Sequence, residues 1–149
     1  MNIKLSKLAY GKIGETLVEL ELEKRGWMVF IPHFEEGIDL VAVKKVGDEF
    51  KYVGVQVKSS TPVHLKGKAY GVAVKKSKLI EASSFFYIYC LMGADKNTFI
   101  VVPSKDMKSM ILQTQKAHVK DTCHFHIDVE TFGKWAEYKN RFDLLEQTW

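Results

Sequence analysis

Residues 37–60, GIDLVAVKKVGDEFKYVGVQVKSS, constrain the fold of this chain more than any other stretch. β-Branched residues are frequent over 38–43, and apolar and polar side chains alternate over 52–58, which is typical of strands. Between the two runs, Gly47 and Asp48 fit a tight two-residue turn of type II′, in which glycine takes the first central position. The stretch is therefore predicted to be a β-hairpin.

The register of this hairpin brings polar side chains together at its open end. Counting outward from the turn places Asp39 directly opposite Gln56. Side chains two apart in a strand share a face, so Lys58 points to the same side as Gln56. Directly opposed residues lie about 5 Å apart at Cβ. An acid, an amide and an ammonium group are thus expected on one face, which fits either a reactive site or an ordinary cross-strand ion pair.

A helix is predicted for residues 5–25, where Glu15 is the one carboxylate in a row of apolar or small residues. Burial of an unpartnered carboxylate is costly, so Glu15 is expected to meet a cation or a metal, unless it lies at the edge of the row and reaches solvent. Gly11 and Gly14 weaken the helix, which is tolerable where a backbone or a ligand approaches closely. The core stripe of this helix is predicted to be Leu5, Ala9, Ile13, Leu17 and Leu20.

The remaining sequence is divided into further predicted strands and helices. Strands are predicted at 27–31, 70–74, 85–91, 98–102 and 122–129. Helices are predicted at 77–83, 104–116 and 129–143. The strand at 122–129 carries His124 and His126 on its outward face, a pair that can bind zinc if a third ligand is supplied from elsewhere.

Composition indicates one globular domain that spans the 149 residues. Hydrophobic residues make up 46% and charged residues 27%, which excludes a disordered chain. No membrane span or signal peptide is evident, so a cytoplasmic location is expected, with Cys90 and Cys123 as reduced thiols. A net charge of +4 is compatible with binding to nucleic acid without requiring it.

The positive charge is carried almost entirely by lysine, because Arg25 and Arg141 are the only arginines. Lysine contacts phosphate as a point charge, whereas arginine supplies the bidentate fork that recognises guanine. A group of lysines near the open end of the hairpin suits a phosphate track for DNA, although such a run is also common on soluble surfaces. These residues are Lys66, Lys68, Lys75, Lys76 and Lys78.

In their order and spacing, three short motifs resemble the PD-(D/E)XK nuclease superfamily. The motifs are Gly14-Glu15, Gly37-Ile38-Asp39 and Gln56-Val57-Lys58-Ser59, and the resemblance covers residues 7–104. Ile38 stands where the family name has proline, and Gln56 stands where a second acid is usual. The Q-x-K version is similar to that of small intron-encoded homing endonucleases.

The resemblance implies a restriction-endonuclease-like α/β fold over residues 1–149, with a central mixed sheet flanked by helices. It also implies an endonuclease that hydrolyses DNA with Mg²⁺ or Mn²⁺. Asp39 would hold the metal together with Gln56, the Val57 carbonyl and Glu15, the last directly or through water. Lys58 would orient or deprotonate the attacking water and stabilise the developing negative charge.

Two other functions fit the same residues. The first is a nucleic-acid-binding member of the fold that has lost cleavage because Gln56 replaces the acid. The second is a protein-interaction domain in which the charged residues form only a buried ion network, which adds little stability. A homodimer or higher assembly is also expected from C-terminal aromatics, which otherwise would cap the chain's own sheet. These aromatics are Trp135, Tyr138, Phe142 and Trp149.

Overall fold

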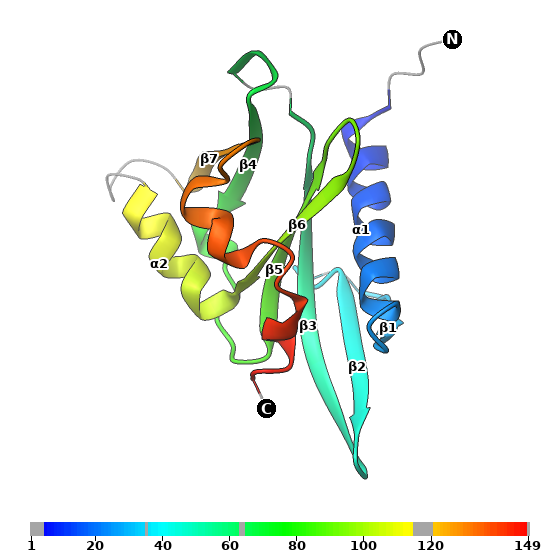
Figure 1. Cartoon of the computed structure of the whole chain (residues 1–149). Coiled ribbons are helices and arrows are strands. Elements are labelled where there is room, and N and C mark those ends of the chain that lie inside the picture. The colour runs from blue at the N-terminus through cyan, green and yellow to red at the C-terminus, as the bar shows by residue number, and fades with distance from the viewer. Residues whose placement is uncertain (1–4, 35, 63–64, 115–120, 149) are drawn as a thin grey trace.

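The computed structural model describes residues 5–34, 36–62, 65–114 and 121–148, arranged in three layers (Figure 1). A five-stranded sheet forms the middle layer. One long helix covers one face, and a two-stranded ribbon with a second helix covers the other. In chain order the helices and strands are α1 (Lys7–Glu23), β1 (Met28–Phe30), β2 (Leu40–Val46), β3 (Glu49–Ser60), β4 (Ala69–Lys75), β5 (Phe85–Met92), β6 (Asn97–Pro103), α2 (Ser104–Thr114) and β7 (Thr122–Asp128).

The strand order of the main sheet is β1-β2-β3-β5-β6, and the ribbon is formed by β4 and β7. β3 and β5 are parallel, and the other neighbouring pairs are antiparallel. The chain therefore crosses from β3 to β5 through β4, which places the ribbon over one face of the sheet. The predicted α/β class with a central mixed sheet flanked by helices is confirmed.

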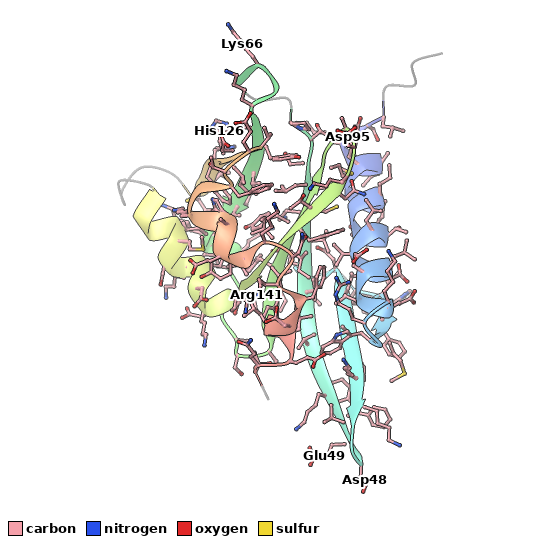
Figure 2. The ribbon with its side chains drawn as sticks, viewed as in Figure 1. Asp48, Glu49, Lys66, Asp95, His126 and Arg141 are labelled. Carbon is pink, nitrogen blue, oxygen red and sulfur yellow. The ribbon has the colours of Figure 1, made fainter. Side chains whose placement is uncertain are left out.

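The β2–β3 hairpin has the register predicted from the turn. Val46 pairs with Glu49 at the tip, and Leu40 pairs with Val55 at the open end. Gly47 has φ +62, which a residue with a side chain rarely adopts. The hairpin tip, with Asp48 and Glu49 labelled in Figure 2, projects beyond the other strands.

Every residue of β5 from Phe85 to Leu91 is buried, so core residues lie on both faces of the sheet. Alternate β5 residues pack against the ribbon and α2, and the others pack against α1. The predicted central strand at 85–91 is confirmed. Neither cysteine is in a disulfide, both are buried, and burial raises the pKa of the Cys90 thiol to about 12.

Helix α1 begins after Ser6, whose Oγ accepts a hydrogen bond from the Ala9 N–H, and it stops before Gly26, which has φ +81. Its predicted core stripe is wrong. The buried residues are Gly14, Val18 and Leu22. Leu5, Ile13 and Leu20 of the predicted stripe are exposed. The buried row lies beside the predicted one, because α1 packs on β3 through the close contact of Gly14 with Ser59.

The predicted α-helices at 77–83 and 129–143 are also wrong. The first region contains only a 3₁₀ turn, η2 (Lys76–Lys78). The second contains two 3₁₀ helices, η3 (Gly133–Tyr138) and η4 (Phe142–Leu145). Phe132 and Asn140 have positive φ, so a continuous α-helix is interrupted on each side of η3. No helix among the described residues is long and apolar enough to cross a membrane.

The C-terminal aromatics complete the core of this chain rather than forming a free surface. Trp135 is 3% exposed and stacks on Phe125 of the ribbon, with ring centroids 4.7 Å apart. Phe142 is also buried, against Phe99 of β6. Trp149 lies outside the described residues. These aromatics therefore do not supply the interface surface that was expected of them.

Candidate active site

A cavity of about 770 Å³ opens between β3 of the main sheet and β4 of the ribbon. Residues from the hairpin's open end form one side of the cavity, and residues from the ribbon and η2 form the other. The residues that line it are Glu36, Gly37, Asp39, Gln56, Lys58, Ala73, Val74, Lys75, Lys78 and Thr122. The sequence-predicted trio of Asp39, Gln56 and Lys58 thus lies in one cavity.

Asp39 is held in place by two hydrogen bonds to β3. Its backbone N–H donates to the Val55 carbonyl at 2.9 Å. Its Oδ2 accepts a hydrogen bond from the Val57 N–H at 2.6 Å. Asp39 thus lies against β3 one residue beyond Leu40 and Val55, which are the last residues that pair in the β2–β3 ladder.

Gln56 and Lys58 point to the ribbon side because the alternate residues of β3 face α1. Val53, Val55 and Val57 are buried in the cluster that contains α1. Gln56 lies beside Tyr87 in the parallel register with β5, and Lys58 lies beside Tyr89. Gln56 and Lys58 are half-buried. Each therefore presents its polar end to the cavity from a rigid strand.

The turn before Asp39 brings a second carboxylate, that of Glu36, to the cavity. Gly37 has φ +82, and a Cβ placed on it would stand 3.4 Å from Ile80 Cδ1 and 3.9 Å from Gln56 Nε2. Glycine therefore allows the turn to pass close to Gln56. From the sequence, Glu36 belongs to a polar entry to the hairpin, which fits either contact with a metal or substrate or, more commonly, a solvated loop. Its position directly before a glycine that opens the hairpin was the available signal.

Glu15 is not among the residues that line the cavity. It lies on α1, on the other layer, and its carboxylate forms an ion pair with Lys12 at 2.7 Å. The preceding Gly14 packs against Ser59, because a Cβ on Gly14 would stand 1.7 Å from Ser59 Oγ. Glu15 is therefore next to the point where α1 touches β3, one residue beyond Lys58.

The five lysines of the predicted phosphate track are distributed over the whole of β4. Lys75 and Lys78 line the cavity, and Lys76 lies between them. Lys66 and Lys68 lie beyond the opposite end of β4. At a rise of about 3.3 Å per residue, Lys68 and Lys75 are roughly 23 Å apart along the strand. Only one end of the lysine group therefore lies at the cavity.

Asp121 anchors the lysine segment that borders the cavity. Its carboxylate accepts hydrogen bonds from the Ser77 N–H at 2.8 Å and from the Ser77 hydroxyl at 2.6 Å. Its backbone carbonyl accepts the Lys76 N–H. The hydrogen bonds from Ser77 lower the pKa of the Asp121 carboxyl, with a smaller contribution from the charges of Lys75 and Lys76.

The donor set at the cavity suits a hard cation. Asp39 and Glu36 supply carboxylates, and Gln56 supplies an amide oxygen. The N–H and C=O of one strand residue point to the same edge, so the Val57 carbonyl points to the edge where its N–H meets Asp39. These oxygens fit Mg²⁺ or Mn²⁺ better than a soft metal.

A zinc site gains no support from the described part of the chain. It contains no group of three or more histidine, cysteine, aspartate or glutamate side chains that could hold a metal ion. His124 and His126 are exposed on β7, on the outer face of the ribbon. The described residues thus supply no third ligand for a zinc site at these two histidines.

No protein-family model matches this chain, and no curated protein matches it. The solved structures that resemble it include two nucleases. The bacterial homing endonuclease I-Ssp6803I is 18% identical, with a TM-score of 0.65 over 96% of this chain and 95% of that one. The Holliday junction resolvase Hjc of Archaeoglobus fulgidus is 17% identical, with a TM-score of 0.47 over 82% of this chain and 86% of that one.

The first comparison shows the fold. The match covers nearly the whole of both chains. The restriction-endonuclease-like fold indicated by the three sequence motifs is therefore confirmed.

Proposed function

We propose that this chain is a metal-dependent DNA endonuclease that hydrolyses phosphodiester bonds. The observation that carries the proposal is the position of three residues around one cavity, with Asp39 directly before β2 and with Gln56 and Lys58 on β3. Hydrolysis of a phosphodiester needs a cation at the phosphoryl oxygen, a positioned water and stabilisation of negative charge. The cavity has residues suited to each of these tasks.

Asp39 and Gln56 hold the cation in this proposal, together with the Val57 carbonyl and Glu15. The hydrogen bond from the Val57 N–H keeps the Asp39 carboxylate at the edge to which the Val57 carbonyl points. Glu15 does not line the cavity, so it contributes its charge from the α1 side through water, after release from Lys12. A bound Mg²⁺ or Mn²⁺ supplies Lewis-acid polarisation of the phosphate.

Lys58 acts on the attacking water and on the charge that develops at phosphorus. Its ammonium lies two residues from Gln56 on the same strand face. From there it orients the water and donates to a phosphoryl oxygen. Lys75 and Lys78, on the opposite wall, offer positive charge to the neighbouring phosphates of the substrate.

The structural likeness and the charge distribution support DNA as the substrate. The solved structure with the TM-score of 0.65 is a homing endonuclease, and its fold is shared over almost the whole chain. The lysines of β4 and η2 border the cavity and continue beyond it. Such an arrangement binds phosphates mainly through charge, so binding is expected to weaken steeply with salt.

A second candidate is a member of the same fold that binds nucleic acid without cutting it. The observation in its favour is that the described residues include no group of three carboxylate or imidazole ligands. Gln56 in place of an acid lowers the charge that holds a divalent cation. The two candidates differ in one measurable property, which is cleavage in the presence of metal.

Supercoiled plasmid incubated with Mg²⁺ or Mn²⁺ distinguishes them. The wild-type chain is expected to nick or linearise the plasmid, and EDTA and Lys58→Ala are each expected to stop the reaction. Lys108→Ala serves as the control, because this lysine is exposed on α2 and pairs with Glu81 away from the cavity. Wild-type protein that binds DNA but leaves the plasmid supercoiled in both metals would establish the non-cutting candidate.

We also propose that two or more copies assemble, because one cavity cuts one strand. The buried C-terminal aromatics do not support this, but the sheet face beside the cavity does. On that face, Val43 of β2 pairs with Met28 of β1 on one side and with Tyr52 of β3 on the other. Phe30 of β1 pairs with Val41 of β2 and lies on the same face. Phe30 and Tyr52 are 56% and 59% exposed, and Phe50 is 49% exposed. An apolar face of this kind is typical of interfaces.

Light scattering at micromolar concentration tests the assembly. A dimer or larger species is expected, and Tyr52→Asp is expected to shift it toward the monomer while circular dichroism stays unchanged. A wild-type chain that is monomeric and only nicks plasmid would reject the assembly and retain a nicking endonuclease.

A further inference from the structure

The β4–β7 ribbon has one exposed face whose residues are paired by register. Gly71 pairs with His126, Ala73 with His124, and Lys75 with Thr122, and directly paired residues share a face. The other face is apolar and buried against the main sheet and α2. The exposed face therefore has no packing role in the core.

The exposed face is continuous with the proposed active site. Ala73, Lys75 and Thr122 belong both to this face and to the lining of the cavity that holds Asp39 and Lys58. A duplex with one phosphate in the cavity must therefore lie along the ribbon or turn sharply away from it. The ribbon extends from the cavity past His126, and Lys66 stands beyond its far end (Figure 2).

The shape of the ribbon suits the major groove of DNA. A groove about 12 Å wide admits a two-stranded β-ribbon. Gly71 and Ala73 have little or no side chain, so the backbone in the middle of β4 can approach the floor of a groove closely. His124 and His126 stand opposite them on β7 with ring nitrogens that donate and accept hydrogen bonds. The length of β4, roughly 23 Å, corresponds to about 6–7 base pairs.

The charges on the ribbon are also complementary to a duplex. Lys75 and Lys78 stand at the cavity end, and Lys66 and Lys68 stand at the other end, so both ends offer contacts to phosphates. Two acidic residues at these ends, Asp121 and Asp128, accept hydrogen bonds within the protein. Asp121 accepts hydrogen bonds from Ser77, and Asp128 accepts them from the N–H groups of Glu130 and Thr131.

We propose that the β4–β7 ribbon enters the major groove next to the scissile phosphate and reads base edges, with His124 as its central contact. This inference rests on the proposed endonuclease function, because it orients the duplex by the cavity. Beyond that function, it specifies the DNA groove that the protein occupies and the residues that select the base sequence. Since the chain has few arginines, selection by histidine and threonine agrees with its composition.

Binding of a fluorescein-labelled duplex by Lys58→Ala protein, followed by anisotropy, tests the ribbon. Two further changes are compared in that background, His124→Glu on the ribbon and Thr16→Glu on the exposed side of α1. Each adds one negative charge, but α1 covers the other face of the main sheet. His124→Glu is expected to weaken binding by about tenfold or more, and Thr16→Glu by less than about twofold.

A conservative variant and a groove-specific probe separate a binding role from a loss of folding. His124→Gln retains hydrogen-bonding groups and is expected to bind within about threefold of the parent. Methylation of guanine N7, which lies in the major groove, is expected to weaken binding, whereas the minor-groove ligand netropsin is expected to have little effect. On plasmid, His124→Ala is expected to cut at a changed set of positions.

Equal affinities for the His124→Glu and Thr16→Glu proteins, or competition by netropsin instead of N7 methylation, would overturn the ribbon proposal. Plasmid cleavage by the wild-type chain in that case would leave the endonuclease proposal intact. The converse result, ribbon-dependent binding without cleavage in either metal, would remove the endonuclease and keep the ribbon.

Discussion

The carboxylate of Asp39 accepts a hydrogen bond from the backbone N–H of Val57 at 2.6 Å. β2 begins at Leu40, so Asp39 lies directly before the strand. Its side chain accepts a hydrogen bond from β3 where the backbone of a longer β2 would have done so. The same carboxylate lines the cavity. Asp39 therefore combines a structural contact with its proposed role as a metal ligand, and the two roles are separable by mutation.

Asp39→Asn is expected to abolish cleavage while leaving the fold intact. The amide oxygen still accepts the Val57 N–H, but the charge that holds the cation is lost. Asp39→Ala is expected to remove both the hydrogen bond and the charge. The free energy of unfolding should fall by about 1–3 kcal/mol, because the Val57 N–H is left unpaired. Plasmid cleavage should fall by at least about a hundredfold in each variant.

Urea unfolding and duplex binding at low salt are measured on the same two variants, to separate loss of stability or of binding from loss of cleavage. Duplex affinity is expected to stay within about threefold of wild type, because lysines supply most of it. Equal loss of binding and cleavage in Asp39→Asn would show that the carboxylate serves the structure alone.

Gln56→Glu is expected to lower the Mg²⁺ concentration needed for cleavage. The change adds a carboxylate on β3 to those of Asp39 and Glu36 and so raises the charge available to a hard cation. The half-saturating Mg²⁺ concentration, measured from initial nicking rates, should fall by about tenfold. Asn97→Asp, which adds the same charge at the exposed start of β6, is the control and should leave it unchanged. A higher Mg²⁺ requirement in Gln56→Glu would exclude this side chain as a ligand.

Gly14→Ala and Gly11→Ala are expected to change stability in opposite directions. A Cβ on Gly14 would meet Ser59 Oγ at 1.7 Å and Ser59 Cβ at 2.9 Å, so α1 must move away from β3. We expect a loss of about 1–3 kcal/mol in the free energy of unfolding. A Cβ on Gly11 meets nothing within 4 Å, so Ala there should stabilise the helix by up to about 1 kcal/mol.

Chemical denaturation of both variants measures these free energies directly. The Gly14→Ala variant also reports on the site, because its shift displaces Glu15 from its place beside β3. Unchanged stability in Gly14→Ala would mean that α1 does not pack as closely on Ser59 as described.

The Asp121–Ser77 contact is expected to stabilise the fold at neutral pH and to be lost in acid. The pKa of Asp121 is lowered from 3.8 in the folded chain, chiefly by the side-chain hydrogen bond from Ser77. A lowered folded pKa contributes stability above the unfolded value, which disappears as the pH falls through the folded value. Asp121→Asn should therefore lower the melting temperature slightly at pH 7, with the difference shrinking below about pH 4. A difference that is the same at both pH values would contradict the assignment.

The hairpin and its polar pair were predictable because local chemistry determines both. Gly47 and Asp48 set the turn, and once the turn is placed, strand geometry alone carries the register to Asp39 and Gln56. The burial of β5 was predictable for a similar reason, since an unbroken apolar run has no polar face to expose. Whether Glu36 reaches the cavity or only solvent was not predictable, because the path of an irregular turn depends on Gly37 and on the Ile80 side chain that packs beside it.

The amino-acid sequence by itself determined the strand register, the trio of Asp39, Gln56 and Lys58, and the fold that they indicate. Only the tertiary structure decided which layer covers which face. Helical spacing allowed α1 either of two rows, and the choice was made by the close contact of Gly14 with Ser59. In the same way, no local pattern placed the ribbon beside the cavity. That position follows from the crossover between the parallel strands β3 and β5, a long-range pairing that neither strand specifies alone.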